Sequence, residues 1–393
     1  MNATAFSRAA VAVAVLAAVP FSQAATEFKF GGYVKTDVIV SDYSEGAPAD
    51  NNVGRDFYVP GTLLGGDKNR DGLVTDISAR ESRFNLSSKS DINGHKLKSF
   101  FEVDFLTHSD GDERISNSYS PRLRHAFVSY DKWMMGQTWS TFQNPGALPE
   151  ALDFTGAGEG TVFMRQAQVR YSNGGLQLSI ENPQTVVRDV YLNADGQPKQ
   201  DRLKPASSYI PDVVARYNFN AGDAKISAAA ILRQLSFEET RARDGLKVDE
   251  TETAYGVSVS GIVPTVGKDK FKFMVNYGDG VGRYMALNYI VDAVLTDNAK
   301  METIGIVSGF ATYQHWWSDK LRSNFVVSML EADYDTKPVA AMNESSMSYI
   351  ANLLYSPIKP VTVGVEYLHA SNELTSGADG DMDRFQATFK YAF

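Results

Sequence analysis

The sequence of 393 residues contains no cysteine, only five histidines and, beyond its first 24 residues, no continuous apolar run of helical membrane-spanning length. Without cysteine the chain has no disulfides and no thiolate metal sites. Without an apolar run of about 20 residues it is not a helical membrane protein. The histidines show no ligand spacing, and nucleophilic triads, glycine-rich phosphate loops and basic nucleic-acid patches are also missing. We therefore expect no enzyme activity, no cofactor, no metal centre and no nucleic-acid partner.

The first 24 residues have the organisation of a Sec-type signal peptide. Arg8 supplies a basic start, residues 9–21 form the apolar run, and Ser22-Gln23-Ala24 supplies small residues before a cleavage site. A membrane anchor is the alternative, but the apolar run is well short of the ~20 residues that span a bilayer. We expect Sec export, removal of residues 1–24 and a single mature domain at 25–393.

The last residues, 383–393, form a strand pattern with one apolar and one polar face. Apolar side chains occupy one parity and polar side chains the other: Phe385, Ala387, Phe389, Tyr391 and Phe393 against Arg384, Gln386, Thr388 and Lys390. Such alternation is typical of a membrane barrel strand with lipid outside and water inside. The terminal aromatic residue also resembles the ending of Gram-negative outer-membrane barrels. We expect this strand to close on the first strand.

Strand character recurs in sixteen segments, and fourteen or eighteen are the alternative counts. The segments are 28–40, 77–89, 96–107, 121–130, 132–139, 161–172, 175–183, 211–219, 223–237, 250–263, 268–278, 303–316, 320–334, 344–356, 359–372 and 383–393. Seven short turns alternate with eight longer polar loops, at 41–76, 108–120, 140–160, 184–210, 238–249, 279–302, 335–343 and 373–382. Short periplasmic turns and long extracellular loops characterise outer-membrane barrels. The predicted fold class is therefore all-β, a transmembrane antiparallel β-barrel of about sixteen strands.

The size of the barrel predicts an open lumen. About sixteen strands leave an aqueous channel, whereas about eight are filled by side chains. A plugged transporter needs about 22 strands and an N-terminal plug, but here the first strand begins within a few residues of the predicted cleavage site. We expect an open or loop-constricted channel.

The third long loop, 140–160, has the composition of a loop folded into the lumen. Pro145 and Pro149 prevent it from continuing the strand ladder. It also carries more apolar side chains than an external loop needs, among them Phe142, Leu152 and Phe154. The third long loop folds inward in trimeric porins, so we expect a constriction loop here. The alternative is an external loop that packs at a subunit interface.

Side-chain parity assigns arginines to the lumen, because a charge facing lipid costs ~2–4 kcal/mol at mid-bilayer. The candidate selectivity residues are Arg83, Arg122, Arg124, Arg170 and Arg216, with Arg80 and Arg165 of opposite parity and requiring a bulge or a position beyond the apolar band. In the segment 121–130 we expect Leu123 and Phe127 to face lipid, which places Arg122 and Arg124 on the lumen side. The third loop adds Glu150, Asp153 and Glu159, which we expect to face the arginines across a narrow opening. Charge rings of this kind set ion selectivity. The alternative is that the arginines pair with neighbouring acids and only stiffen the wall.

A weak calcium candidate lies in the first long loop. Asp67, Asn69 and Asp71 match the first half of an EF-hand loop, but Ser78 stands where its last ligand, a glutamate, is required. A solvated turn is the preferred interpretation.

Several stretches resemble the DcaP-like family of trimeric outer-membrane porins, most densely over residues 27–220. They are Phe28-Lys-Phe-Gly-Gly-Tyr-Val-Lys35, Gly54-Arg-Asp-Phe-Tyr-Val-Pro60, Ala79-Arg-Glu-Ser-Arg-Phe-Asn-Leu86, Pro121-Arg-Leu-Arg-His-Ala-Phe127, Gly136-Gln-Thr-Trp-Ser-Thr-Phe-Gln143 and Arg165-Gln-Ala-Gln-Val-Arg-Tyr171. The resemblance implies uptake of dicarboxylates and other anionic solutes by a homotrimer. Some members have a helical segment before the first strand that is missing here, so we expect trimer contacts between barrels only.

The sequence thus predicts a passive porin of the Gram-negative outer membrane that contacts lipid and lipopolysaccharide and prefers small anions such as dicarboxylates. A general non-selective porin is the first alternative. A structural, adhesive or enzymatic barrel is the alternative from another class.

Overall fold

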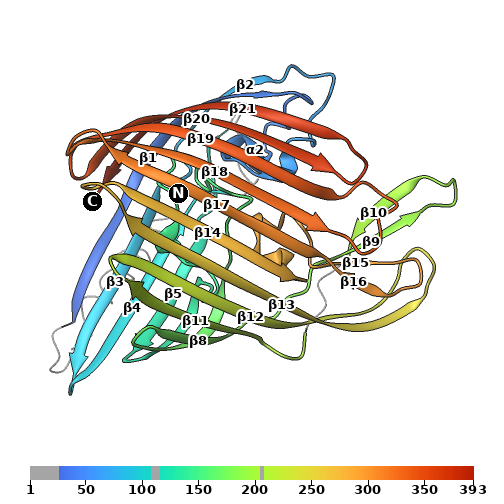
Figure 1. The fold of residues 1–393 in the computed structure, drawn as a ribbon, viewed down its shortest axis with the longest axis horizontal. Helices are drawn as coiled ribbons and strands as arrows, with labels where there is room; N and C mark the ends of the chain where they lie inside the picture. The colour runs from blue at the N-terminus through green and yellow to red at the C-terminus, as the bar shows by residue number, and fades with distance from the viewer. Residues whose placement is uncertain (1–25, 108–115, 204–207) are drawn as a thin grey trace, which may run out of the picture.

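The computed structural model describes residues 26–107, 116–203 and 208–393 as a closed antiparallel barrel (Figure 1). Its main sheet has 17 strands, and β2 and β3 share one position because both pair with β1. The described barrel therefore has sixteen strand positions, which confirms the predicted fold class and count. Within these ranges, no helix is long and apolar enough to cross a membrane. The predicted signal peptide, 1–24, lies outside the described residues, as does much of the predicted loop 108–120.

The strands of the barrel wall are β1 (Glu27–Tyr43), β2 (Leu73–Ser78), β3 (Arg83–Ile92), β4 (His95–Asp104), β5 (Arg122–Tyr130), β6 (Trp133–Trp139), β7 (Arg165–Asn173), β8 (Leu176–Glu181), β11 (Asp212–Ala221), β12 (Ala224–Thr240), β13 (Lys247–Pro264), β14 (Lys270–Asp279), β17 (Gly305–Trp316), β18 (Leu321–Asp333), β19 (Asn343–Ile358), β20 (Val361–Leu374) and β21 (Asp379–Ala392). The loops contain α2 (Val53–Asp56), η1 (Pro60–Thr62), η2 (Pro145–Ala147), η3 (Gly282–Tyr284), η4 (Ala286–Asn288), β9 (Val187–Leu192), β10 (Pro198–Arg202), β15 (Ala293–Leu295) and β16 (Met301–Thr303).

The last strand shows why the alternating sequence forms this wall. In β21, Phe385 and Phe389 are 62% and 52% exposed on the outer surface, whereas Arg384 and Gln386 are 1% and 4% exposed inside. This two-residue period matches the pleat of a strand. β21 pairs with β1 from Tyr33↔Ala392 to Tyr43↔Met382. The predicted closure of the last strand on the first is confirmed.

The two ends of the barrel differ in their connections. Short turns join β3 to β4, β5 to β6 and the later pairs at the end where the C-terminus lies, while the hairpin β9–β10 projects from the opposite end (Figure 1). Asn93 and Gly94, both at positive φ (55° and 84°), make a two-residue hairpin turn between β3 and β4. In outer-membrane barrels the short turns face the periplasm, which sets the orientation of this barrel in the membrane.

Two predicted boundaries are wrong. The segment 77–89 is not one strand, because residues 79–82 interrupt the wall between β2 and β3. The loops 184–210 and 279–302 are not free of strands, since they contribute β9, β10, β15 and β16 to a second sheet. The strand β10, Pro198–Arg202, is exposed along its length. A strand without a buried face shows no alternation, so periodicity missed it.

Three long loops fold into the lumen and pack against one part of its wall, which we call the packed half of the barrel. The first (44–72), third (140–164) and sixth (280–304) loops share one apolar core with the inner faces of strands β11–β21. Tyr58, Phe142 and Tyr284 are buried members of this core, one from each loop. The third and sixth loops also pair through their backbones, with Phe163 N donating to Tyr284 O at 2.9 Å and Ala286 N donating to Thr161 O at 3.0 Å. The inward fold of the third loop was predicted, whereas that of the other two was not.

Candidate functional site

Six arginines lie on alternate strands from β3 to β11, on the part of the wall outside the packed half. We call Arg83, Arg122, Arg124, Arg165, Arg170 and Arg216 the arginine wall; they come from β3, β5, β7 and β11. Arg165 begins β7 and has Arg83, Arg122 and Arg124 as its electrostatic neighbours. Arg170 lies nearer the periplasmic end of β7 and is grouped with Arg216. We call Arg83, Arg122, Arg124 and Arg165, which lie towards the end of the barrel with the long loops, the upper group. We call Arg170 and Arg216, which lie nearer the short turns, the lower group.

A β-bulge brings two arginines of β5 to the lumen. Glu102 of β4 pairs with His125, and Val103 pairs with Leu123, so Arg124 has no partner across the ladder. The extra residue shifts the parity of the rest of β5. The prediction that Phe127 faces lipid is wrong for this reason: Phe127 pairs with Phe100 on the inner face, with ring centroids 5.8 Å apart.

Three members of the upper group share a set of acids. Arg122 makes a bidentate pair with Asp104, at 2.8 and 2.7 Å. Arg124 donates to both Glu102 and Asp104 at 2.8 Å. Arg83 lies farther away, 3.7 Å from Glu102. Bidentate arginine–carboxylate pairs are rigid, so part of this group stiffens the wall.

The other three arginines have no carboxylate partner within ion-pair distance among the described residues. Arg170 donates to the carbonyl of Trp139 at 2.5 Å and to the Gln168 side chain at 2.9 Å. Arg216 donates to the carbonyl of Gln143 and to the Gln177 side chain. Neutral acceptors satisfy guanidinium hydrogen bonds without cancelling charge. None of the three forms a direct ion pair with a described residue, although Asp104 lies near Arg165, and Glu181 lies near Arg170 and Arg216.

Arg165 reaches the lumen from the start of β7 by packing on aromatic rings. Its guanidinium carbon lies 4.5 Å from the Trp139 ring centroid and 5.6 Å from that of Phe163. Its Nη1 is buried without a hydrogen-bond partner among the described residues. Cation–π contact supports a guanidinium without neutralising it. Strand parity alone would point Arg165 towards lipid. Arg165 is the first residue of β7, so its side chain can turn inward beyond the regular part of the strand.

The third loop presents an aromatic side chain to the upper group. The Phe154 ring centroid lies 5.4 Å from the guanidinium of Arg124, 5.6 Å from Arg122 and 6.0 Å from Arg83. Phe154 in turn contacts Phe57 of the first loop, with centroids 5.0 Å apart. The side of the loop that faces these arginines is therefore aromatic.

The loop acids lie elsewhere, and the expectation that they face the arginines is wrong. Glu150 pairs with Arg322 of β18 at 2.5 Å. Asp153 accepts from Tyr58 N at 2.8 Å and pairs with Arg384 of β21 at 3.3 Å. Glu159 is fully buried and accepts from the hydroxyl of Ser348 in β19. These acids fasten the loop to the opposite side of the barrel.

Wall residues outside the predicted set complete this fastening. Glu366 of β20 accepts from the backbone N–H groups of Leu152 and Asp153, at 2.7 and 2.8 Å. Lys35 of β1 donates to Leu152 O at 2.6 Å. Parity identifies Glu366 and Lys35 as inward-facing, but the sequence contains no signal for the loop backbone atoms that they bind.

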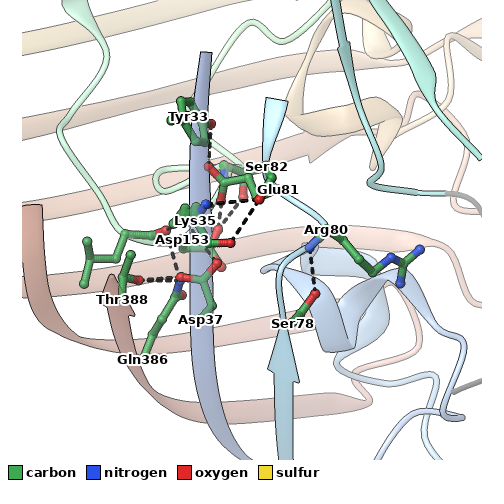
Figure 2. Close-up of polar contacts among 12 residues, drawn as sticks. Tyr33, Lys35, Asp37, Ser78, Arg80, Glu81, Ser82, Asp153, Gln386 and Thr388 are labelled. Atoms are coloured by element: carbon green, nitrogen blue, oxygen red, sulfur yellow. Dashed lines mark hydrogen bonds and ion pairs between the residues drawn. The ribbon is translucent and has the colours of Figure 1, made fainter. Parts of the chain in front are cut away.

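The interruption between β2 and β3 separates Arg80 from the arginine wall. Figure 2 shows Lys35 among Glu81, Asp37 and Asp153, with Arg80 pointing away from this cluster. The Ser82 hydroxyl accepts from Lys35 N at 3.0 Å, replacing a strand partner at the break. Arg80 pairs with Asp56 at 2.6 Å and stacks on Tyr119 at 4.1 Å. The structure therefore does not bring Arg80 together with the other candidates.

The weak calcium candidate forms a local turn. Asp67 accepts from Asn69 N at 3.0 Å, and Asp71 accepts from Leu73 N at 3.1 Å. In the described part of the chain, no group of three metal-ligating side chains is present. The carboxylates are engaged by their own backbone, as in Asx turns.

Comparisons place this architecture among known channels. The sequence model described as DcaP outer membrane protein matches residues 14–393. No curated protein sequence matches the chain. The outer membrane channel DcaP of Acinetobacter baumannii is similar in structure, with a TM-score of 0.74, 22% identity and coverage of 94% of this chain and 97% of that one.

Two other porins share the fold at lower similarity. Salmonella typhi OmpF in complex with daunomycin has a TM-score of 0.56 and 12% identity, covering 93% of this chain and 97% of that one. The trimer form of Vibrio cholerae OmpT has a TM-score of 0.50 and 12% identity, covering 94% and 100%. These likenesses concern the barrel fold alone. Because the family match spans nearly the whole chain, the protein belongs to the DcaP outer membrane protein family, a family of outer-membrane channels.

Proposed function

We propose that this protein is a passive, anion-preferring channel for small solutes such as dicarboxylates. The observation that carries the proposal is a set of guanidinium groups on β7 and β11 that form no direct ion pair with a carboxylate among the described residues. Arg165, Arg170 and Arg216 contact neutral acceptors or aromatic rings instead of carboxylates. A wall with uncompensated positive charge attracts anions and repels cations. Guanidinium groups also bind carboxylates in bidentate geometry, which favours solutes with carboxylates.

The two groups of the wall supply successive contacts along the path. A solute entering from outside meets the upper group first, where the Phe154 ring restricts the space before the guanidinium groups. It then meets Arg170 and Arg216 nearer the periplasm. Two successive binding sites of moderate affinity allow a carboxylate to move from the upper group to the lower group. Conduction requires binding that is weak enough to release the solute.

The proposal includes a homotrimer of Sec-exported subunits in contact with outer-membrane lipid and lipopolysaccharide. The trimer form of OmpT, which shares the fold, supports the assembly. The apolar outer surface, including Phe385 and Phe389, supports lipid contact. The size of the purified protein in mild detergent tests the trimer, and the N-terminal residue of the mature protein tests cleavage after Ala24.

Planar-bilayer recording tests the channel and its preference. Reconstituted protein should give discrete ion steps, and a salt gradient should give a reversal potential of anion-selective sign. Protein without steps would refute the channel, and a reversal potential near zero would favour the general porin. Fluxes of matched mono- and dicarboxylates then define the solute.

The residues are tested by replacing Arg165, Arg170 and Arg216 together with methionine. The reversal potential should move towards cation selectivity because three unpaired charges are lost. Lys225→Met is the matched control, since Lys225 is a lysine at the periplasmic end of β12 outside the arginine wall. An unchanged reversal potential in the triple variant would mean that these arginines are structural.

A further inference from the structure

A second basic site lies on the packed half of the barrel, away from the arginine wall. It is a cavity of about 860 Å³ between the underside of the third loop and the short turns after β17 and β19. We call it the periplasmic cavity because it opens among the short turns. No residue of the arginine wall lines it. Its volume is that of a small-molecule site.

The cations of the cavity outnumber its acids. Lys272, Lys320, Arg322 and Lys359 line it, together with Glu150 and Asp319. Both acids are already engaged, Glu150 by Arg322 at 2.5 Å and Asp319 by Lys268 at 2.7 Å. In the described ranges, Lys272, Lys320 and Lys359 form no ion pair with a carboxylate. The side chains that line the cavity therefore carry a formal net charge of +2.

The rest of the lining combines apolar and neutral polar side chains. Leu148 and Pro149 of the third loop, Trp316 of β17 and Ile358 at the end of β19 supply the apolar surface, and Gln314, Ser356 and Thr362 also line the cavity. A site with an apolar surface and a few charged groups of one sign fits an amphiphilic ligand. The charged groups fix the orientation of the ligand, and the apolar surface holds its body.

We propose that the periplasmic cavity binds a small amphiphilic anion, with one or two carboxylate or sulfonate groups on a ring or short apolar body. The site uses none of the residues of the arginine wall, so it does not require that wall to be anion-selective. Its cations also hold the loop tip, since Lys272 donates to Leu148 O at 2.8 Å and Arg322 pairs with Glu150. An anion bound here therefore competes for groups that fasten the third loop.

Calorimetric titration of the purified full chain with benzene-1,3-disulfonate tests the site. The double variant Lys272→Met/Lys359→Met should bind the probe about ten-fold more weakly, because two charge-assisted hydrogen bonds to the probe are removed. Lys225→Met, which removes another periplasmic-end lysine, should bind like the unmodified protein. Lys359 is exposed in a turn, so Lys359→Met alone gives a folded variant with a smaller loss of affinity if the double variant fails to fold.

Three results would overturn the proposal. The first is no binding of the probe to the unmodified protein, and the second is unchanged affinity in both lysine variants. The third is equal loss of affinity in the Arg165, Arg170 and Arg216 triple variant, which would place the probe on the arginine wall. Channel selectivity is measured separately on the same variants, so failure of the conduction proposal remains distinguishable from failure of this site.

Discussion

The two halves of the lumen use the same residue types for different purposes. On strands β12–β21 the inward side chains lie under three loops, and apolar residues such as Phe310 and Leu330 are buried there. On strands β3–β11 the inward side chains include the arginine wall, and most of its members are only partly buried. A barrel of this size needs both halves. Packed loops narrow the lumen, and the remaining wall determines which ions pass.

The contrast is sharpest between two arginines. Arg233 of β12 is buried between Asp212 at 3.2 Å and Asp292 at 2.8 Å, and it fastens the sixth loop. Arg165 has four charged neighbours, of which three are arginines. One guanidinium is held between two carboxylates, whereas the other has no directly paired carboxylate among the described residues. Direct ion pairing therefore distinguishes these two arginines, although they are the same residue type.

The largest expected effect is the loss of stability in Arg233→Met. Removing this cation leaves Asp212 and Asp292 buried and unpaired, which costs about 3–5 kcal/mol of unfolding free energy. Denaturant unfolding followed by tryptophan fluorescence measures it. A loss below about 1 kcal/mol would show that the buried acids find other partners, or protonate at little cost.

The opposite result is expected for Arg165→Met. This change removes a cation that no carboxylate compensates and keeps most of the packing against Trp139, so stability should stay within about 1 kcal/mol of the unmodified protein. The reversal potential should move towards cation selectivity. If Arg165→Met instead unfolds as readily as Arg233→Met with unchanged selectivity, direct ion pairing does not distinguish the roles of these two arginines.

Much of the wall was predictable because a strand has a strict two-residue period. Parity placed Arg384 inside and Phe385 outside, as found. Parity fails beyond an extra residue in the ladder, as for Phe127 after the bulge at Arg124, since a bulge leaves no mark in the hydrophobic pattern. The break at residues 79–82 was missed for a related reason: Ser82 replaces a backbone partner with its side chain.

The strands that the loop side chains contact could not be predicted from the sequence. The composition of the third loop indicated that it folds inward, but it did not show which wall the loop would contact. Glu150, Asp153 and Glu159 were expected opposite the arginines and instead bind β18, β21 and β19. Such contacts join residues far apart in the sequence, and nothing in local periodicity encodes them. The inward fold of the sixth loop was missed although residues 284–295 are mostly apolar, which is the same kind of signal that indicated the inward fold of the third loop.

Glu150 offers a test of the fastening through pH. Burial acts to raise the pKa of Glu150, but hydrogen bonds from Arg322 and its positive charge outweigh this, and the pKa lies below its ordinary value. A depressed pKa means that the ionised form stabilises the fold above the ordinary carboxylate range, and that this contribution is lost as pH falls through the folded-state pKa. Channel noise should therefore stay low from pH 7 to about pH 4 and rise below it. The channel current of Glu150→Gln should be noisy at every pH and should show no rise in noise near pH 4. If the variant and the unmodified protein have the same dependence of noise on pH, Glu150 does not hold the third loop in place.

The smallest expected effect concerns the aromatic face opposite the upper arginines. Phe154→Ala removes a ring that lies 5.4–6.0 Å from three guanidinium groups, and each of these cation–π interactions is worth about 0.5–1 kcal/mol at a partly exposed site. The charges themselves remain, so single-channel conductance should rise modestly while the reversal potential stays anion-selective. Phe154→Leu is the control that keeps most of the volume without the π face, and its conductance should stay near that of the unmodified protein. A loss of selectivity in both variants would show that the ring positions the arginines; unchanged conductance in Phe154→Ala would show that the ring does not bound the path.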